Sequence, residues 1–261
     1  IFEDIALEKY MAASTTFLLK CKQLFQLQKS EQAIILLGKA GCGKTTVWKT
    51  TIDAIDRFTN TTSAIHIVDT KVLSKEELYG SLNPATLEWK DGVFTDIVRN
   101  CYSNYCEGDT NTHTWIVFDG NIDPDYAETI NSVLDDNRIL TLPNGERIPF
   151  ISTIHLIFET NTIQYATPAT ISRCTIIWIE DHLVPHYDIF VQQLSFKFEV
   201  LSANNSIPST FLNLTLQYIK KILNRELWDK LEAIKLDWSA VLNNNHLSPI
   251  TSLVASLISF I

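Results

Sequence analysis

Short apolar runs alternate along the chain with longer segments in which apolar residues recur at helical spacing. Continuous apolar runs are typical of strands buried on both faces, which have no solvent-facing positions. Five such runs predict strands, at residues 33–37, 64–68, 114–118, 154–158 and 175–179. The segments between them predict helices, over residues 4–29, from 45 onward, within 73–98 with a break at Asn83-Pro84, over 122–136 and over 168–172. This alternation predicts an α/β domain whose mostly parallel five-stranded sheet is flanked by helices.

Two further patterns refine this picture. Residues 139–150 predict a hairpin whose turn is Pro143-Asn144-Gly145, and Asn-Gly suits a type I′ turn. From about residue 182 strand-like runs vanish and helical patterns dominate, as in 211–223 and 227–236. We therefore predict a large α/β subdomain over residues 1–182 and a small helical lid over 183–261. Both chain ends look cut, so we expect a segment of a longer polypeptide with an incomplete lid.

A glycine-rich octapeptide follows the first predicted strand and precedes a helix. It matches the Walker A pattern G-x-x-x-x-G-K-[ST]. The backbone N–H groups of such a turn and the positive end of the helix bind phosphates. Lys44 is expected to reach the β- and γ-phosphates of ATP, and the Thr45 hydroxyl to bind Mg²⁺. The predicted nucleotide-binding residues are Gly38, Lys39, Ala40, Gly41, Cys42, Gly43, Lys44, Thr45 and Thr46. The alternative, a turn in a protein that binds no nucleotide, is disfavoured by the complete match.

A second acidic element follows the strand at residues 114–118. Asp119 ends this strand and is predicted to hold Mg²⁺. The next residue is Gly120, which has no side chain to accept a proton or to orient water. Asp123 is close in sequence but is expected to point elsewhere. A simpler role for Asp119, capping the helix that follows, is the alternative.

Composition narrows the possible functions. The 261 residues carry a formal charge of −9 and no Lys/Arg run, which argues against nucleic-acid binding. Five scattered cysteines make neither a disulfide framework nor a zinc pattern. No apolar stretch reaches 18 residues, so no membrane span is predicted.

Four segments stand out, WIVFDGNIDP at 115–124, NSVLDDN at 131–137, LTLPNGER at 140–147 and ATPATISRC at 166–174, and the segments IVDTK at 67–71 and ELYG at 77–80 fit with them. With these segments, residues 30–182 resemble the second AAA+ module of dynein heavy chains. The resemblance implies one of six AAA+ modules in a ring, with a lid after the P-loop domain. It also implies a module that binds ATP without hydrolysing it, and Gly120 points the same way. The match looks closest to cytoplasmic-type heavy chains, although the axonemal class stays open.

The resemblance also assigns a sensor and an arginine finger. Aligning strand ends puts Glu159 at the sensor position, with Asn161 two residues on, and either could instead be an ordinary loop residue. Arg173 falls where AAA+ modules face the neighbouring nucleotide, so it would act in trans on the preceding module. The alternative is a salt bridge to a nearby carboxylate such as Glu180.

The leading hypothesis is an ATP-binding, non-hydrolysing module that braces the ring of a microtubule motor. Its expected cofactors are ATP and Mg²⁺. Its expected partners are neighbouring modules, microtubules and dynein accessory chains, in the cytoplasm and cytoskeleton. One rival is an active ATPase that positions water with Asp123, Glu159 or a group from another module. A second rival is a spacer that binds no nucleotide, which would not need Lys44, Thr45 and Asp119 together.

Overall fold

The computed structural model describes residues 2, 4–5, 15–83 and 88–180, together with residues 191, 195, 214, 217–221 and 226. The chain divides into two compact units, residues 1–9 with 13–184 and residues 10–12 with 185–261. The predicted lid and its helices at 211–223 and 227–236 lie almost wholly outside the described residues. The domain boundary at residue 182 therefore stays a prediction, and the following account concerns the first unit.

Five parallel strands form the central sheet, and all five were predicted. They are β1 (Ala33–Leu37), β2 (Thr62–Asp69), β5 (Thr112–Asp119), β8 (Ile154–Thr160) and β9 (Thr175–Trp178), in the order β2-β5-β8-β1-β9. Every neighbouring pair is parallel. In sheets of this kind ligands bind outside the carboxyl ends of the strands. The order places the end of β1, from which the glycine-rich loop departs, next to the end of β8.

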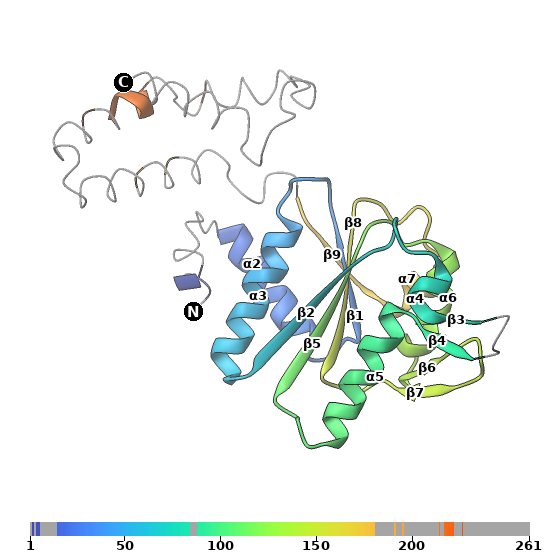
Figure 1. Cartoon of the computed structure of the whole chain (residues 1–261). Coiled ribbons are helices and arrows are strands. Elements are labelled where there is room, and N and C mark those ends of the chain that lie inside the picture. Colours follow the sequence, from blue (N-terminus) through green and yellow to red (C-terminus); the bar gives the residue numbers. More distant parts are fainter. Residues whose placement is uncertain are drawn as a thin grey trace. The chain divides into compact units, whose positions relative to one another are not determined.

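Helices cover both faces of this sheet. Figure 1 shows α2 (Thr15–Leu27) and α3 (Lys44–Thr59) on one face. On the other face lie α4 (Lys75–Tyr79), α5 (Val93–Cys106), α6 (Pro124–Leu134) and α7 (Pro168–Arg173). Because both faces are covered, the central strands are buried throughout, which is why they appear in the sequence as continuous apolar runs. The α/β class predicted from the sequence is confirmed.

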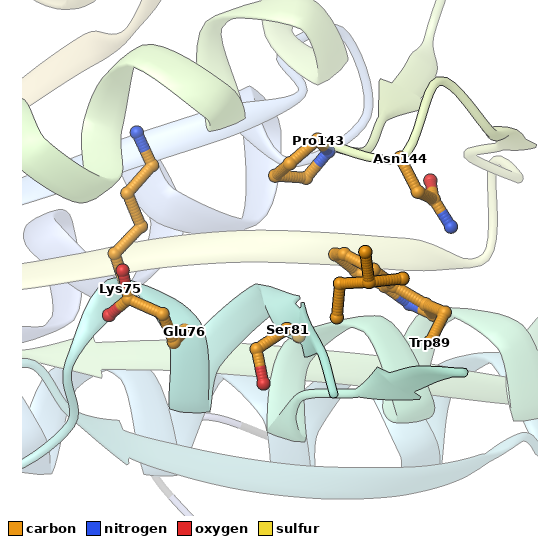
Figure 2. Close-up of a pocket in the computed structure, with 8 residues that line it drawn as sticks. Lys75, Glu76, Ser81, Trp89, Pro143 and Asn144 are labelled. Carbon is orange, nitrogen blue, oxygen red and sulfur yellow. The ribbon is translucent and has the colours of Figure 1, made fainter. Parts of the chain in front are cut away.

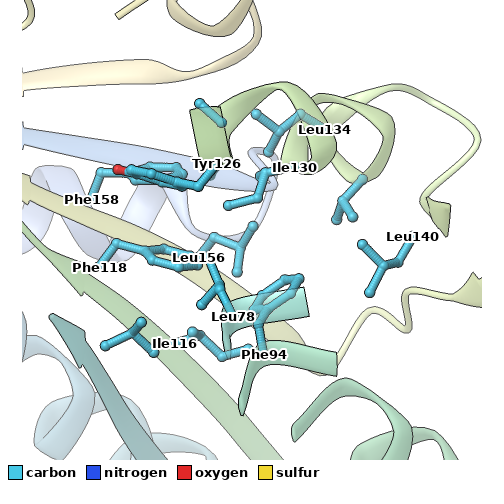
Figure 3. Close-up of a cluster of buried hydrophobic side chains, with 14 of the residues drawn as sticks. Leu78, Phe94, Ile116, Phe118, Tyr126, Ile130, Leu134, Leu140, Leu156 and Phe158 are labelled. Carbon is cyan, nitrogen blue, oxygen red and sulfur yellow. The ribbon is translucent and has the colours of Figure 1, made fainter. Parts of the chain in front are cut away.

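An aromatic stack holds the carboxyl ends of β5 and β8 together. Phe118 and Phe158 stack with ring centroids 5.1 Å apart, and Tyr126 of α6 stacks on Phe118 at 5.8 Å. Figure 3 shows these rings in the buried cluster with Phe94 and the aliphatic side chains around it. Close packing of this kind tolerates little displacement. The stack therefore fixes the residues that follow on each strand, Asp119 and Glu159.

Two hairpins extend from the face that α4–α7 cover. The hairpin of β6 (Ile139–Thr141) and β7 (Arg147–Pro149) was predicted, but its turn is not type I′. Gly145 has a φ of 85°, whereas Asn144 is not among the residues with positive φ. The Gly145 N–H donates to the Leu142 carbonyl, which makes Pro143 and Asn144 the central residues of the turn. Proline at the first central position, with its fixed negative φ, is incompatible with type I′.

The second hairpin, of β3 (Gly80–Leu82) and β4 (Trp89–Asp91), was not predicted. It occupies part of the region where helices were expected. Arg99 of α5 joins the two hairpins, because its guanidinium bonds Asp91 and Glu146 at 2.7 Å each. A cavity of about 480 Å³ lies between the hairpins, with Pro143 and Asn144 opposite Trp89 (Figure 2). No residue of the glycine-rich loop lines it.

Candidate nucleotide-binding site

The glycine-rich loop joins the end of β1 to the start of α3. Gly43, the residue before the helix, has a φ of 100°, which residues with a Cβ adopt only at a cost. No side chain caps α3. The N–H groups of its first turn are therefore not satisfied by a cap and face the loop, which is the arrangement that binds an anion. A Cβ on Gly41 would meet no atom within 4 Å, so this part of the loop is open.

Lys44 lies folded over the loop with its side chain only 5% exposed. Its Nζ donates to the carbonyls of Gly38 and Lys39, both at 2.8 Å. The third hydrogen bond goes to Asn161 Oδ1 at 3.0 Å. Three acceptors match the three donors of an ammonium group. All three donors are thus bonded within the protein, so a phosphate would have to replace at least one of these acceptors.

The ends of β5 and β8 carry the acidic residues of the site. Asp119 and Glu159 are partners in the parallel register of these strands. Side chains alternate between the faces of a strand, so both carboxylates lie on the face opposite Phe118 and Phe158. That face is covered by α3, which brings the carboxylates toward the Walker A residues.

Glu159 is bonded through both carboxylate oxygens. The Thr45 hydroxyl donates to its Oε1 at 2.6 Å, and the Trp48 indole Nε1 donates to its Oε2 at 2.8 Å. Sequence reasoning missed Trp48. The available signal was its position three residues after Thr45, which puts both side chains on one side of α3.

Both sensor candidates reach the Walker A loop. β8 runs to Thr160, two residues beyond the predicted strand, because polar residues continue it past its apolar run. Asn161 therefore follows the strand directly and lies on the same side as Glu159. Glu159 bonds Thr45, and Asn161 bonds Lys44. The assignment of a sensor to Glu159 or Asn161 therefore stays a prediction.

The helix after β5 is capped by Asp123. This side chain accepts from the Asp125 N–H at 3.2 Å, and α6 begins at Pro124. The alternative in which Asp119 caps the helix is thus wrong. Gly120 has a φ of 139°, and its N–H donates to the Glu159 carbonyl at 3.0 Å. A Cβ there would lie 2.4 Å from Thr70 Oγ1, so the backbone at position 120 requires glycine.

Arg173 ends α7 on the opposite face of the sheet from α3. Its Nε bonds Asp135 Oδ1 at 2.5 Å, and its Nη1 donates to the Ala169 carbonyl. A salt bridge does exist, but its partner is Asp135 and not Glu180. The side chain remains 34% exposed. Burial raises the pKa of the adjacent Cys174 thiol to about 12, so that thiol is neutral and adds no charge beside the guanidinium.

These residues fit ATP with Mg²⁺. Mg²⁺ usually keeps several waters and takes one or two protein ligands together with phosphate oxygens. Thr45 and Asp119 supply that number, and among the described residues no cluster of three or more His, Cys, Asp or Glu is placed to hold a metal alone. The open loop, the uncapped helix and the buried ammonium together suit a polyphosphate.

The sheet order, the glycine-rich loop and the acidic strand end define a P-loop nucleotide-binding domain. Residues 33–174 match the family model of the AAA domain of the dynein-related subfamily. The chain belongs to this family. Membership implies that the site binds a nucleotide, ATP. Within the described residues, no helix has the length and apolar character to cross a membrane.

Cytoplasmic dynein heavy chains are similar to this chain. That of Saccharomyces cerevisiae is 44% identical over 220 residues, which cover 80% of this chain and 5% of the relative. That of Paramecium tetraurelia is 44% identical over 182 residues, covering 70% and 4%. That of Drosophila melanogaster is 43% identical over 176 residues, covering 67% and 4%. The chain is thus a homologue of these proteins that spans about a twentieth of their length.

Proposed function

We propose that the chain is the second AAA+ module of a dynein heavy chain and holds ATP·Mg²⁺ without hydrolysing it at a useful rate. Gly120 carries this proposal, because the residue after the metal-binding Asp119 has no group to activate water. General-base catalysis typically contributes about 10²- to 10⁴-fold in rate. A complete phosphate-binding loop next to a position without a general base favours a site that binds ATP and keeps it unhydrolysed.

The other nearby carboxylates support the same conclusion. Asp123 is engaged as the cap of α6, and both oxygens of Glu159 are bonded within the loop. These bonds hold Asp123 at the start of α6 and Glu159 against α3, which fixes where each carboxylate points. This disfavours the rival of an active ATPase built from the chain's own residues. The spacer rival is disfavoured by the joint presence of Lys44, Thr45 and Asp119, which a spacer would not need.

The bound nucleotide would brace the ring between neighbouring modules. Arg173 would serve the preceding module as an arginine finger in trans. Its support is its exposure at the end of a short helix, where Asp135 and the Ala169 carbonyl orient the guanidinium. A planar, always charged group held in this way suits stabilisation of a γ-phosphate. Microtubules and accessory chains would be partners of the whole motor, in the cytoplasm and on the cytoskeleton.

The nucleotide recovered from this site tests the proposal. In the full-length heavy chain, with the other nucleotide sites disabled, ATP should remain mainly ATP after long incubation. Lys44→Ala should remove most nucleotide binding, since the phosphates would lose their main cation. This variant is the matched control for nucleotide that is bound elsewhere in the heavy chain. Mainly ADP at this site would refute the lack of hydrolysis. Equal amounts of bound nucleotide in the wild type and in Lys44→Ala would refute binding at this loop.

A further inference from the structure

We propose that Glu159, held in place by Trp48, is a positioning residue for Mg²⁺ that orients the Thr45 hydroxyl toward the metal. This inference rests on the proposed binding of ATP·Mg²⁺. It adds two residues, one of them the previously unassigned Trp48, to the expected pair of Thr45 and Asp119.

The direction of one hydrogen bond is the first step. A hydroxyl has one proton and two lone pairs. Thr45 donates that proton to Glu159 Oε1 at 2.6 Å, a short distance typical of a charge-assisted bond. With its proton directed to the carboxylate, the oxygen keeps its lone pairs for a cation. Glu159 therefore selects the hydroxyl rotamer that can bind Mg²⁺.

Trp48 is the second step. Its side chain is 1% exposed, and its indole nitrogen can only donate a hydrogen bond. That bond goes to Glu159 Oε2 at 2.8 Å. The indole ring cannot move without disturbing the core between α3 and the sheet. Glu159 is thus held at one oxygen by a rigid donor, so the other oxygen meets Thr45 in a fixed place.

The third step is the division of roles between two carboxylates. Asp119 lies in register with Glu159 and is exposed at the strand end. Glu159 is occupied by its two donors, whereas Asp119 is placed to take the metal or its waters. Such outer partners of a metal ligand typically change metal affinity by about 10- to 100-fold when they are replaced.

The test measures the Mg²⁺ dependence of nucleotide binding. In the full-length heavy chain with the other sites disabled, binding of a fluorescent ATP analogue is titrated with Mg²⁺ and repeated in EDTA. Glu159→Gln should raise the Mg²⁺ concentration at half-saturation about 10- to 100-fold. Its affinity in EDTA should be unchanged or tighter, because a negative charge near the phosphates is lost. Trp48→Phe keeps the charge and should give a smaller shift in the same direction.

Asp69→Asn is the matched control. Asp69 ends β2 in register with Asp119, and its carboxylate accepts from the Lys71 N–H rather than from the loop. The Asp69→Asn substitution removes one charge at the same sheet edge and should leave the Mg²⁺ concentration at half-saturation nearly unchanged. An equal shift in Asp69→Asn and Glu159→Gln would overturn the positioning role in favour of general electrostatics. If Glu159→Gln weakens nucleotide binding equally with and without Mg²⁺, the positioning role is overturned in favour of a distorted loop.

Failure of the underlying function has a different signature. If wild type and Lys44→Ala bind the analogue equally poorly at every Mg²⁺ concentration, the nucleotide site itself is refuted, and the positioning role falls with it. If the wild type binds and Lys44→Ala does not, while Glu159→Gln matches the wild type throughout, only the positioning role is refuted.

Discussion

Replacing Gly120 with alanine should destabilise the fold by about 2–6 kcal/mol, as the sum of two effects. The first is the backbone, since a residue with a Cβ at a φ of 139° is strained by about 1–3 kcal/mol. The second is overlap, because the new Cβ would lie 2.4 Å from Thr70 Oγ1. Forcing an atom into occupied space costs about 1–3 kcal/mol.

Two further variants separate these effects. Gly108 has a φ of 101°, and a Cβ there would meet nothing within 4 Å. Gly108→Ala should therefore show only the backbone cost. Thr70→Ala removes the overlapping oxygen, whose own bonds to the Asp119 and Asn121 carbonyls are long at 3.4 and 3.3 Å. The added cost of Gly120→Ala in the Thr70→Ala background should fall to the level of Gly108→Ala.

Chemical denaturation of the four variants and the wild type measures these differences. Equal destabilisation by Gly120→Ala and Gly108→Ala would refute the overlap, as would an undiminished cost in the Thr70→Ala background. The result bears on catalysis too. From the sequence alone, glutamate at position 120 would be expected to restore some turnover. The geometry instead predicts that glutamate at position 120 would strain the backbone and overlap Thr70, so the fold would be destabilised whether or not the new carboxylate could orient water.

Two other predictions concern Arg173 and His155. Arg173→Lys should leave nucleotide binding at the glycine-rich loop intact and slow hydrolysis in the preceding module by about 10³-fold or more, as measured by microtubule-stimulated ATPase. Asp135→Asn, which keeps the guanidinium, is its control, and an equal loss in both variants together with a lowered melting temperature would favour a purely structural salt bridge. Burial lowers the pKa of His155 from 6.5 to about 4, so the unfolded chain binds the proton more readily, and stability should fall by up to about 3 kcal/mol as pH drops through that window. Denaturation midpoints measured between pH 4 and 6.5 should depend on pH much less in His155→Gln than in the wild type. An unchanged pH dependence would contradict the assignment to His155.

The sequence predicts the central strands well because these strands are buried on both faces. The apolar runs at 33–37 and 114–118 have no other simple interpretation once they alternate with helices. The end of β8 was misjudged for the opposite reason. Its last residues, Glu159 and Thr160, are polar, so the apolar run stops before the strand does. The hairpin of β3 and β4 has strands of three residues, too short to show any period.

The pairings within the site could not be predicted, because they depend on the order of strands. Thr45 and Glu159 are 114 residues apart, and Lys44 and Asn161 are 117 apart. They meet because β8 inserts between β5 and β1, a placement that no local pattern encodes. Given that order, the rest follows from the alternation of side chains along a strand. Residues 159 and 161 then face α3 together, and one strand end meets both the ammonium group of Lys44 and the hydroxyl of Thr45.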